Sequence, residues 1–221
     1  MKFLVAFSCL LAVVAAGEYC YNDVVGSCGS KGVDLKNCHA KYGAAHEVMF
    51  DLQSYVNAHI GRSFDYLLMS THFGNYEKSR EGFEKLFRKL SDTTWDDAID
   101  LIKYITKRGG VMNFSARKAQ EDEPEDKTLE LYELGALAHG LDTQKKLAEE
   151  ALFIHGEATR RREGYHDPEV SSYLEEHFMH RHAEVVRDLA GHTNDLKRLL
   201  SENKQTSLAL FLFDEYLQKV V

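Results

Sequence analysis

Helix-breaking residues are scarce after residue 45, and this scarcity limits the folds open to the chain more than any other feature. The two prolines of the sequence are Pro124 and Pro168, and two adjacent glycines stand at Gly109 and Gly110. Because proline and glycine are the poorest helix formers, long helices are expected between these points. Apolar residues recur every three or four positions, as amphipathic helices require, from 46 to 73, from 83 to 105, from about 128 to 156, from 170 onward and from about 206 to 219.

These stretches predict an all-α fold. Helices of nearly thirty residues are about 40 Å long at a rise of 1.5 Å per residue, which favours a four-helix bundle, and the last stretch would form a short fifth helix. The segment between the second and third helices has about twenty residues, enough to cross the bundle once from end to end. The sequence "RGG" at 108–110 marks the end of the second helix, since it combines a basic residue with glycine.

The N-terminal residues 1–16 have the form of a secretory signal peptide. Lys2 precedes an apolar run, and the small residues Ala15 and Ala16 suggest cleavage after Ala16. A membrane anchor is the alternative, but the run is shorter than the ~20 residues that a bilayer core requires. We therefore expect no membrane span, and a protein that is secreted or held in the lumen of the secretory pathway (ER or Golgi).

Three cysteines, Cys20, Cys28 and Cys38, lie in the segment 17–45, which is predicted to be an N-terminal extension. In an oxidising compartment they should form disulfides, and an odd number cannot all pair within one chain. The sequence leaves open a Cys20–Cys28 or a Cys28–Cys38 bond, with the remaining thiol free for a partner chain. A zinc site is disfavoured because the cysteines are too far apart for a short metal-binding knuckle.

Charge and size narrow the remaining choices. With 221 residues, 44% of them hydrophobic, the chain can form one domain, assigned to 46–221, in addition to the extension. The formal net charge of -8 argues against a nucleic-acid partner and favours cations.

The tripeptide "NFS" makes Asn113 a candidate for N-glycosylation just after the second helix.

Four further motifs occur in order along the chain: "FDYLLMSTHF" (64–73), "YITKRGG" (104–110), "YHDPEVSSYLEEHFM" (165–179) and "SLALFLFDEYL" (207–217). They resemble parts of helices A, B, D and E of the ferritin family. The signal peptide and the cysteine-bearing extension resemble those of secreted insect ferritins. The resemblance covers roughly 46–219 and implies a 24-subunit shell that stores iron as an Fe(III) mineral. A lipid-binding or cytokine-like bundle would fit the periodicity but leaves these motifs unexplained.

The resemblance also assigns positions to a ferroxidase centre, a carboxylate-rich di-iron site. The family takes a glutamate and a tyrosine from helix A, a Glu-x-x-His from helix B, a glutamate from helix C and a glutamine from helix D. In this sequence those positions fall on His59, Tyr66, Thr94, Asp97, Gln144 and His182, so that only the tyrosine is kept. The only Glu-x-x-His in the chain runs from Glu163 to His166, in an expected turn.

The mismatch implies a light-type subunit without ferroxidase activity, working beside a heavy-type chain to which an interchain disulfide could join it. The alternative is a ferroxidase with an altered ligand set, Asp97, His59 and His182. Asp97 shares a helical stripe with apolar residues, so it is expected to point between the helices and to bond with His59 or His182.

Other carboxylates suggest different roles. Asp96 and Asp100, with Asp92 further round the helix, lie on another flank of the second predicted helix. The resemblance implies that this flank faces the mineral cavity and that its carboxylates seed the mineral. The alternative is a solvated face that these aspartates share with lysines. Glu175 matches a carboxylate of the three-fold pores, although its companion falls on Ser172. In "EEHFMHRH", His177, His180 and His182 are not spaced as a helical metal-binding pair, which favours structural roles.

Overall fold

The computed structural model describes residues 20–21, 24, 38–118, 130–160, 166–202 and 205–221. The proposed signal peptide, Cys28 and Glu163 lie outside these residues. The all-α prediction is confirmed: the bundle consists of α2 (Met49–Phe73), α3 (Glu81–Lys107), α4 (Glu133–Ala158) and a continuous fourth rod formed by α5 (Pro168–Leu174), the π-helical segment η1 (Glu175–Met179) and α6 (His180–Glu202), followed by the short α7 (Thr206–Val220).

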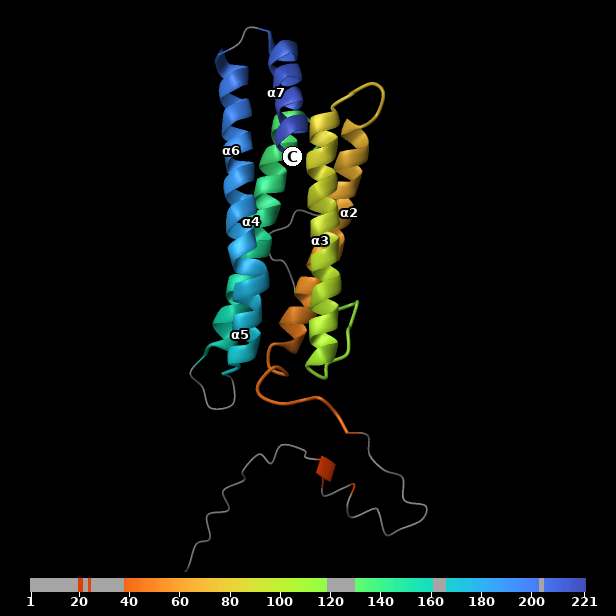
Figure 1. Ribbon diagram of the computed structural model, residues 1–221, viewed down its shortest axis with the longest axis vertical. Coiled ribbons are helices and arrows are strands. Elements are labelled where there is room, and N and C mark those ends of the chain that lie inside the picture. The colour runs from red at the N-terminus through yellow and green to blue at the C-terminus, as the bar shows by residue number, and fades with distance from the viewer. Residues whose placement is uncertain (1–19, 22–23, 25–37, 119–129, 161–165, 203–204) are drawn as a thin grey trace, which may run out of the picture.

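The helices form two side-by-side pairs (Figure 1). α2 packs along α3, and α4 packs along α6, while α7 packs against α3 and α6 at the end of the bundle where α4 begins. The end of α3 and the start of α4 lie at opposite ends of the bundle (Figure 1), as a single long crossover between the second and third helices requires. Among the described helices, none combines the length and apolar character needed to cross a bilayer.

The ends of α3 are fixed by two different devices. At its C-terminus Gly109 has a φ of 75°, a left-handed conformation that glycine adopts without strain. At its N-terminus the cap comes from α7, because Asp214 Oδ1 accepts the backbone N–H groups of Gly82 and Phe83 at 2.9 and 3.1 Å. A buried carboxylate on one helix therefore satisfies the free amides of another and holds α7 in place.

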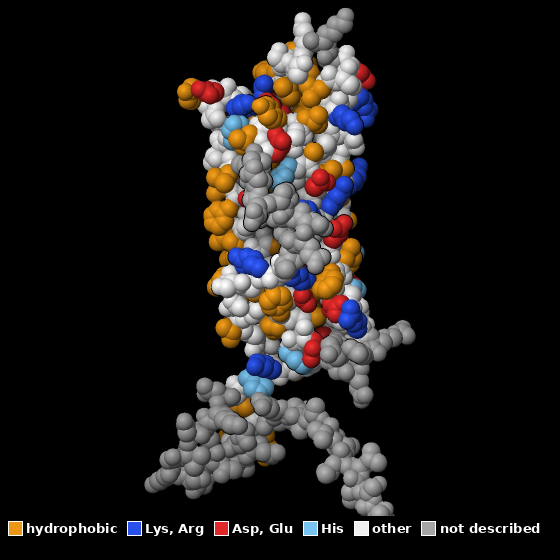
Figure 2. Space-filling view, turned by 180° about the vertical axis from the view of Figure 1, so that it is seen from behind, with side chains coloured by type: hydrophobic (Ala, Val, Ile, Leu, Met, Phe, Trp, Pro, Cys, Tyr) orange, Lys and Arg blue, Asp and Glu red, His pale blue; other side chains and the backbone are white. Residues whose placement is uncertain are grey.

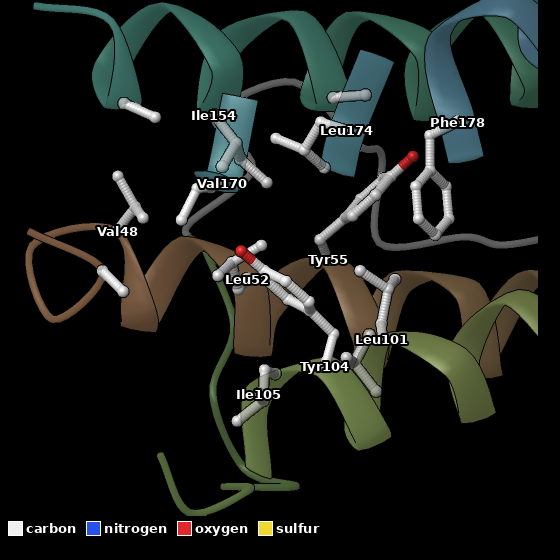
Figure 3. Close-up of a cluster of buried hydrophobic side chains, with 14 of the residues drawn as sticks. Val48, Leu52, Tyr55, Leu101, Tyr104, Ile105, Ile154, Val170, Leu174 and Phe178 are labelled. Carbon is white, nitrogen blue, oxygen red and sulfur yellow. The ribbon is translucent and has the colours of Figure 1, made fainter. Parts of the chain in front are cut away.

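Two groups of buried apolar side chains fill the bundle. Figure 3 shows the first, in which Leu52 and Tyr55 of α2 face Leu101 of α3 and Phe178 of η1. The second surrounds Phe73, Phe83, Phe87, Leu137, Leu189 and Phe213 near the other end. Burying a side chain of this size stabilises the folded state by roughly 1.5–3 kcal/mol. Between the two groups, all four helices bury polar residues instead.

The fourth rod is not a regular α-helix, although the sequence predicted one. Its buried residues Val170, Leu174, Phe178 and His182 follow one another at intervals of four. In an α-helix each step of four overshoots a full turn by about 40°, so the row would drift off the core face. The wider turn of η1 takes up this drift and keeps His182, with its neighbour Arg181, beside the bundle interior.

The disulfide differs from both pairings that the sequence left open. Cys20 bonds to Cys38, with 5.5 Å between their Cα atoms and a sequence separation of 18. The predicted Cys20–Cys28 and Cys28–Cys38 bonds are both wrong. Loop length could not reveal this, because the entropy of closing a loop changes only slowly with its length.

Candidate functional site

A layer of buried polar side chains separates the two apolar groups, and it contains every position that the resemblance assigns to a ferroxidase centre. Each of these residues is at most 6% exposed, and they come from α2 (His59 and Tyr66), α3 (Thr94 and Asp97), α4 (Gln144) and α6 (His182). Residues that are far apart in the sequence thus meet at one level of the bundle.

A chain of hydrogen bonds crosses this layer. The hydroxyl of Tyr66 donates to the carbonyl of Gly140 at 3.1 Å and accepts from Gln144 Nε2 at 3.3 Å. Gln144 Oε1 lies 3.3 Å from His182 Nδ1, and His182 Nε2 lies 2.8 Å from the hydroxyl of Tyr55. Since an amide oxygen only accepts, Nδ1 of His182 carries the proton and its Nε2 accepts from Tyr55. Both nitrogens of His182 are therefore occupied.

His59 is placed differently. Its Nδ1 donates to the carbonyl of Tyr55 at 2.9 Å, while its fully buried Nε2 has no hydrogen-bond partner among the described residues. The nearest carboxylate oxygen, Asp97 Oδ2, is 4.0 Å away, too far for a hydrogen bond. Burial is the main reason that the pKa of His59 falls to about 3 and that of His182 to about 4. Both rings are neutral near pH 7.

Asp97 bonds to Arg181, which corrects the prediction that its partner would be His59 or His182. Arg181 Nη2 donates to Asp97 Oδ1 in a close ion pair, across 84 positions of sequence. Burial raises the pKa of Asp97 to about 6, although Arg181 acts in the opposite direction. The sequence analysis does not predict Arg181 as a site residue, because it stands among histidines. The one feature that could have indicated it is its position next to His182 on a helix that faces the core.

A cavity of about 140 Å³ adjoins the layer. It is lined by Asp97, Arg181 and His182 of the layer, and by both apolar and polar side chains of α3 and α6, as far as the C-terminal residue Val221. The polar layer is therefore connected to a hollow between α3, α6 and α7 rather than sealed on every side.

The side chains present do not fit a di-iron centre. Such a centre binds its two metals mainly through carboxylates, whereas this layer offers Asp97 paired to a guanidinium, with two neutral imidazoles nearby. Within the part of the chain that the structure describes, no three His, Cys, Asp or Glu side chains converge as a metal site.

The other aspartates of α3 lie apart from this layer. Asp92, Asp96 and Asp100 are all exposed. Asp92 forms an ion pair with Arg88 at 3.0 Å, and Asp100 forms one with Lys103 at 3.0 Å. They occupy a mixed-charge face of the helix while Asp97 alone of this group turns inward.

Glu175, the predicted pore residue, lies at the start of η1 and bonds to a residue that the sequence did not single out. Its Oε1 is 2.6 Å from Nε2 of His155 on α4, and the companion position, Ser172, is exposed. His177 is also exposed, with its ring centroid 4.7 Å from that of Tyr173. His180 is exposed as well, whereas His182 is buried, so the three histidines of "EEHFMHRH" do not share one environment.

Asn113, the predicted glycosylation site, is exposed just beyond the end of α3. Its side-chain oxygen accepts the backbone N–H of Ser115 at 2.9 Å. The sequon therefore lies on the surface of the described chain.

Comparison with known proteins gives one consistent result. The sequence model of the Ferritin-like domain matches residues 51–199. The chain is 50% identical to a ferritin light chain of Trichoplusia ni, over 100% of both chains, and 43% identical to a ferritin light chain of Drosophila melanogaster, over 99% of this chain and 100% of that one. The crystal structure of the Trichoplusia ni secreted ferritin superposes with a TM-score of 0.86 at 50% identity, covering 93% of this chain and 100% of that chain.

Proposed function

The chain belongs to the ferritin family, and from that premise we propose that it is a light-type subunit of an iron-storage shell, without ferroxidase activity of its own. The observation that carries the proposal is the ion pair between Asp97 and Arg181 in the polar layer. A ferroxidase centre would need carboxylates free to bind iron at this level, and here a guanidinium holds the carboxylate that faces inward.

In this role the chain depends on a partner. A heavy-type ferritin chain, in the same 24-subunit shell, oxidises Fe(II), and the exposed carboxylates Asp96 and Asp100, with Asp92 nearby, receive Fe(III) and seed the mineral. Glu175 lines a pore through which iron passes, a weaker route here because Ser172 replaces the second carboxylate. The names of the two light-chain relatives are consistent with this division of labour.

Assembly into a shell is supported by the apolar side chains that the bundle leaves uncovered. On α7, Leu208, Phe211, Leu212 and Tyr216 are 45–55% exposed, and apolar side chains are also visible along the bundle surface in Figure 2, among interspersed acidic and basic ones. Large exposed apolar surfaces are unusual for a monomer. Neighbouring subunits would cover them.

The N-terminal segments are consistent with a secreted protein. Residues 1–16 are proposed to be a signal peptide, 17–45 a disulfide-bonded extension and 46–221 the bundle. The Cys20–Cys38 bond agrees with an oxidising compartment. Cys28, left outside that bond, is proposed to join the heavy-type partner. We also propose a glycan on exposed Asn113; an unchanged gel mobility after glycosidase treatment of the secreted protein would argue against it.

A second candidate function rests on His59. Its buried Nε2 lacks a partner and faces Asp97, as a metal ligand would, so a ferroxidase with the altered ligands Asp97, His59 and His182 is the alternative. Stopped-flow absorbance separates the two. The chain purified without a partner should oxidise Fe(II) no faster than buffer, whereas a rapid, saturable phase that is lost in Asp97→Ala would establish the alternative.

A further inference from the structure

We propose that the cavity between α3, α6 and α7 binds a small neutral amphiphile with a hydroxyl head group and a short alkyl tail. Such a site would be separate from the role in iron storage and independent of it. Three features of the cavity support this function: its elongated shape, the succession of apolar and polar side chains along it, and the balance of charges that surrounds it.

The cavity is long and narrow. On α3 its lining extends from Leu86 to Asp97, and on α6 it extends from Arg181 to His192. A helical stretch of this length spans about 16 Å. The bundle is open enough on this side, because α2 packs on α4 whereas α3 and α6 make few close contacts with each other. A volume of about 140 Å³ along that length suits an extended chain better than a compact ring.

The buried part of the lining changes from apolar to polar along the cavity. Leu86, Leu90 and Leu189 are 7%, 8% and 2% exposed and provide apolar surface. Leu90 and Leu86 precede Asp97 by about two and three helical turns on α3, so the apolar surface and the polar layer follow one another along the helix. A ligand with an apolar tail and one polar end matches this order.

The polar part of the cavity suits a hydroxyl group. Oδ1 of Asp97 accepts from Arg181, whereas Oδ2 faces His59 Nε2 at 4.0 Å, beyond hydrogen-bonding distance. The hydroxyl of Thr94, which can donate or accept, also lines the cavity. A ligand hydroxyl could therefore donate to the carboxylate and accept from Thr94, which satisfies both of its own capacities.

The charges around the cavity favour a neutral ligand. In the polar layer Asp97 and Arg181 compensate each other, and the exposed lining residues Lys89 and Asp188 have opposite signs. His182 is neutral near pH 7, because burial lowers its pKa to about 4. A carboxylate or ammonium head group would lose its hydration shell beside a like charge. A hydroxyl group avoids this cost.

The test is a titration of assembled wild-type protein with linear alcohols, followed by saturation-transfer NMR. Saturable binding is expected, with an affinity that rises about fourfold for each methylene added between butanol and hexanol, which corresponds to the transfer free energy of a methylene group. Hexanoate and hexylammonium have the same tail with a charged head, and they should bind at least about tenfold more weakly than hexanol.

Three variants locate the binding site. Val185→Phe places a ring in the apolar part of the cavity and should weaken hexanol binding at least about tenfold. Val186→Phe makes the same change at the next residue of α6, which does not line the cavity, and should bind like wild type. Thr94→Val keeps the shape and removes the hydroxyl, so hexanol binding should weaken about two- to tenfold while the gain per methylene persists.

The possible results separate the proposal from its alternatives. If Val185→Phe does not fold, as judged by circular dichroism, Val185→Leu adds one methylene and should weaken binding by a smaller factor. Absence of saturable alcohol binding would mean that the cavity holds only water. Equal binding by the cavity-filling variants would place the alcohol elsewhere, such as between subunits, and equal binding of hexanoate would remove the preference for a neutral head. Each of these three results overturns the proposal, and none involves Fe(II) oxidation, so its failure is distinct from failure of the proposed function.

Discussion

Arg108 and Asp167 form a buried, two-pronged ion pair between the end of α3 and the start of α5. Nη2 of Arg108 lies 2.7 Å from Oδ2 of Asp167 and Nη1 lies 3.1 Å from Oδ1, with the two side chains 1% and 3% exposed. The same groups bind the extension, because Arg108 Nη2 donates to the carbonyl of Tyr42 at 3.1 Å and Asp167 accepts the N–H of Ala44 at 3.0 Å. One ion pair thus joins three segments of the chain.

Breaking this pair should strongly destabilise the protein. In Arg108→Leu the carboxylate of Asp167 stays buried without its partner, a loss of about 3–5 kcal/mol. Denaturant unfolding measures it, with Arg88→Ala as the control, since its exposed ion pair with Asp92 should contribute about 0–1 kcal/mol. Similar losses for the two variants would show that the buried pair has no special weight.

Acid should destabilise the fold through the buried imidazoles. Below their ordinary pKa of 6.5, His59 and His182 take up protons in the unfolded chain, but in the folded chain burial holds their pKa values at about 3 and 4. Asp97 opposes this, since its folded pKa of about 6 lies above the ordinary 3.8. For these three groups the unfolded state binds about one proton more than the folded state, so together they should lower stability by about 1.4 kcal/mol per pH unit as the pH drops below 6.

The His59→Gln variant checks that sign and size. It removes one of the two imidazoles, so the fall in stability between pH 7 and 5 should become clearly shallower than in the wild type, by about 1 kcal/mol per pH unit. His46→Gln changes an exposed histidine and should behave like wild type. A wild-type stability that rises on acidification in this range would contradict the assignment of neutral, buried rings.

The exposed aspartates of α3 should affect mineral growth and not iron oxidation. Asp96→Asn/Asp100→Asn removes two charges without changing shape, so in shells mixed with a heavy-type chain the onset of core growth should be delayed while Fe(II) is oxidised at the same rate. Asp142→Asn on α4, also exposed, is the matched control. Superimposable growth curves would mean that this face of α3 is only a solvated surface.

The disulfide pattern predicts which cysteine reaches a partner. Because Cys20 and Cys38 are bonded to each other, Cys28 should carry any interchain disulfide. Non-reducing electrophoresis of the secreted protein should then show a heterodimer that separates into its two chains when a reducing thiol is added. In Cys28→Ser that band should vanish while the Cys20–Cys38 peptide persists in mass mapping. Monomer alone in the wild type, with one free thiol per chain, would rule the link out.

Much of the fold follows from local pattern. The three- and four-residue spacing of apolar side chains predicts the long helices, and their observed starts and ends differ from the predicted ones by a few residues. The end of α3 could also be predicted, from the "RGG" sequence at 108–110. In the structure Gly109 there has the positive φ that favours glycine. The inward position of Asp97 follows from the helical stripe that it shares with Leu90 and Leu101, all three of them buried.

Partners across the bundle belong to the tertiary structure alone. Arg108 looks in the sequence like a basic residue at a helix end, yet it is buried against Asp167, and Asp97 bonds to Arg181 rather than to a histidine. Helical periodicity determines which face a residue occupies, but not which residue of another helix stands opposite. That choice depends on the axial register of the helices and, for Arg181, on the π-helical turn that precedes it. The Cys20–Cys38 bond likewise belongs to the tertiary structure, because the spacing of the three cysteines in the sequence does not single it out.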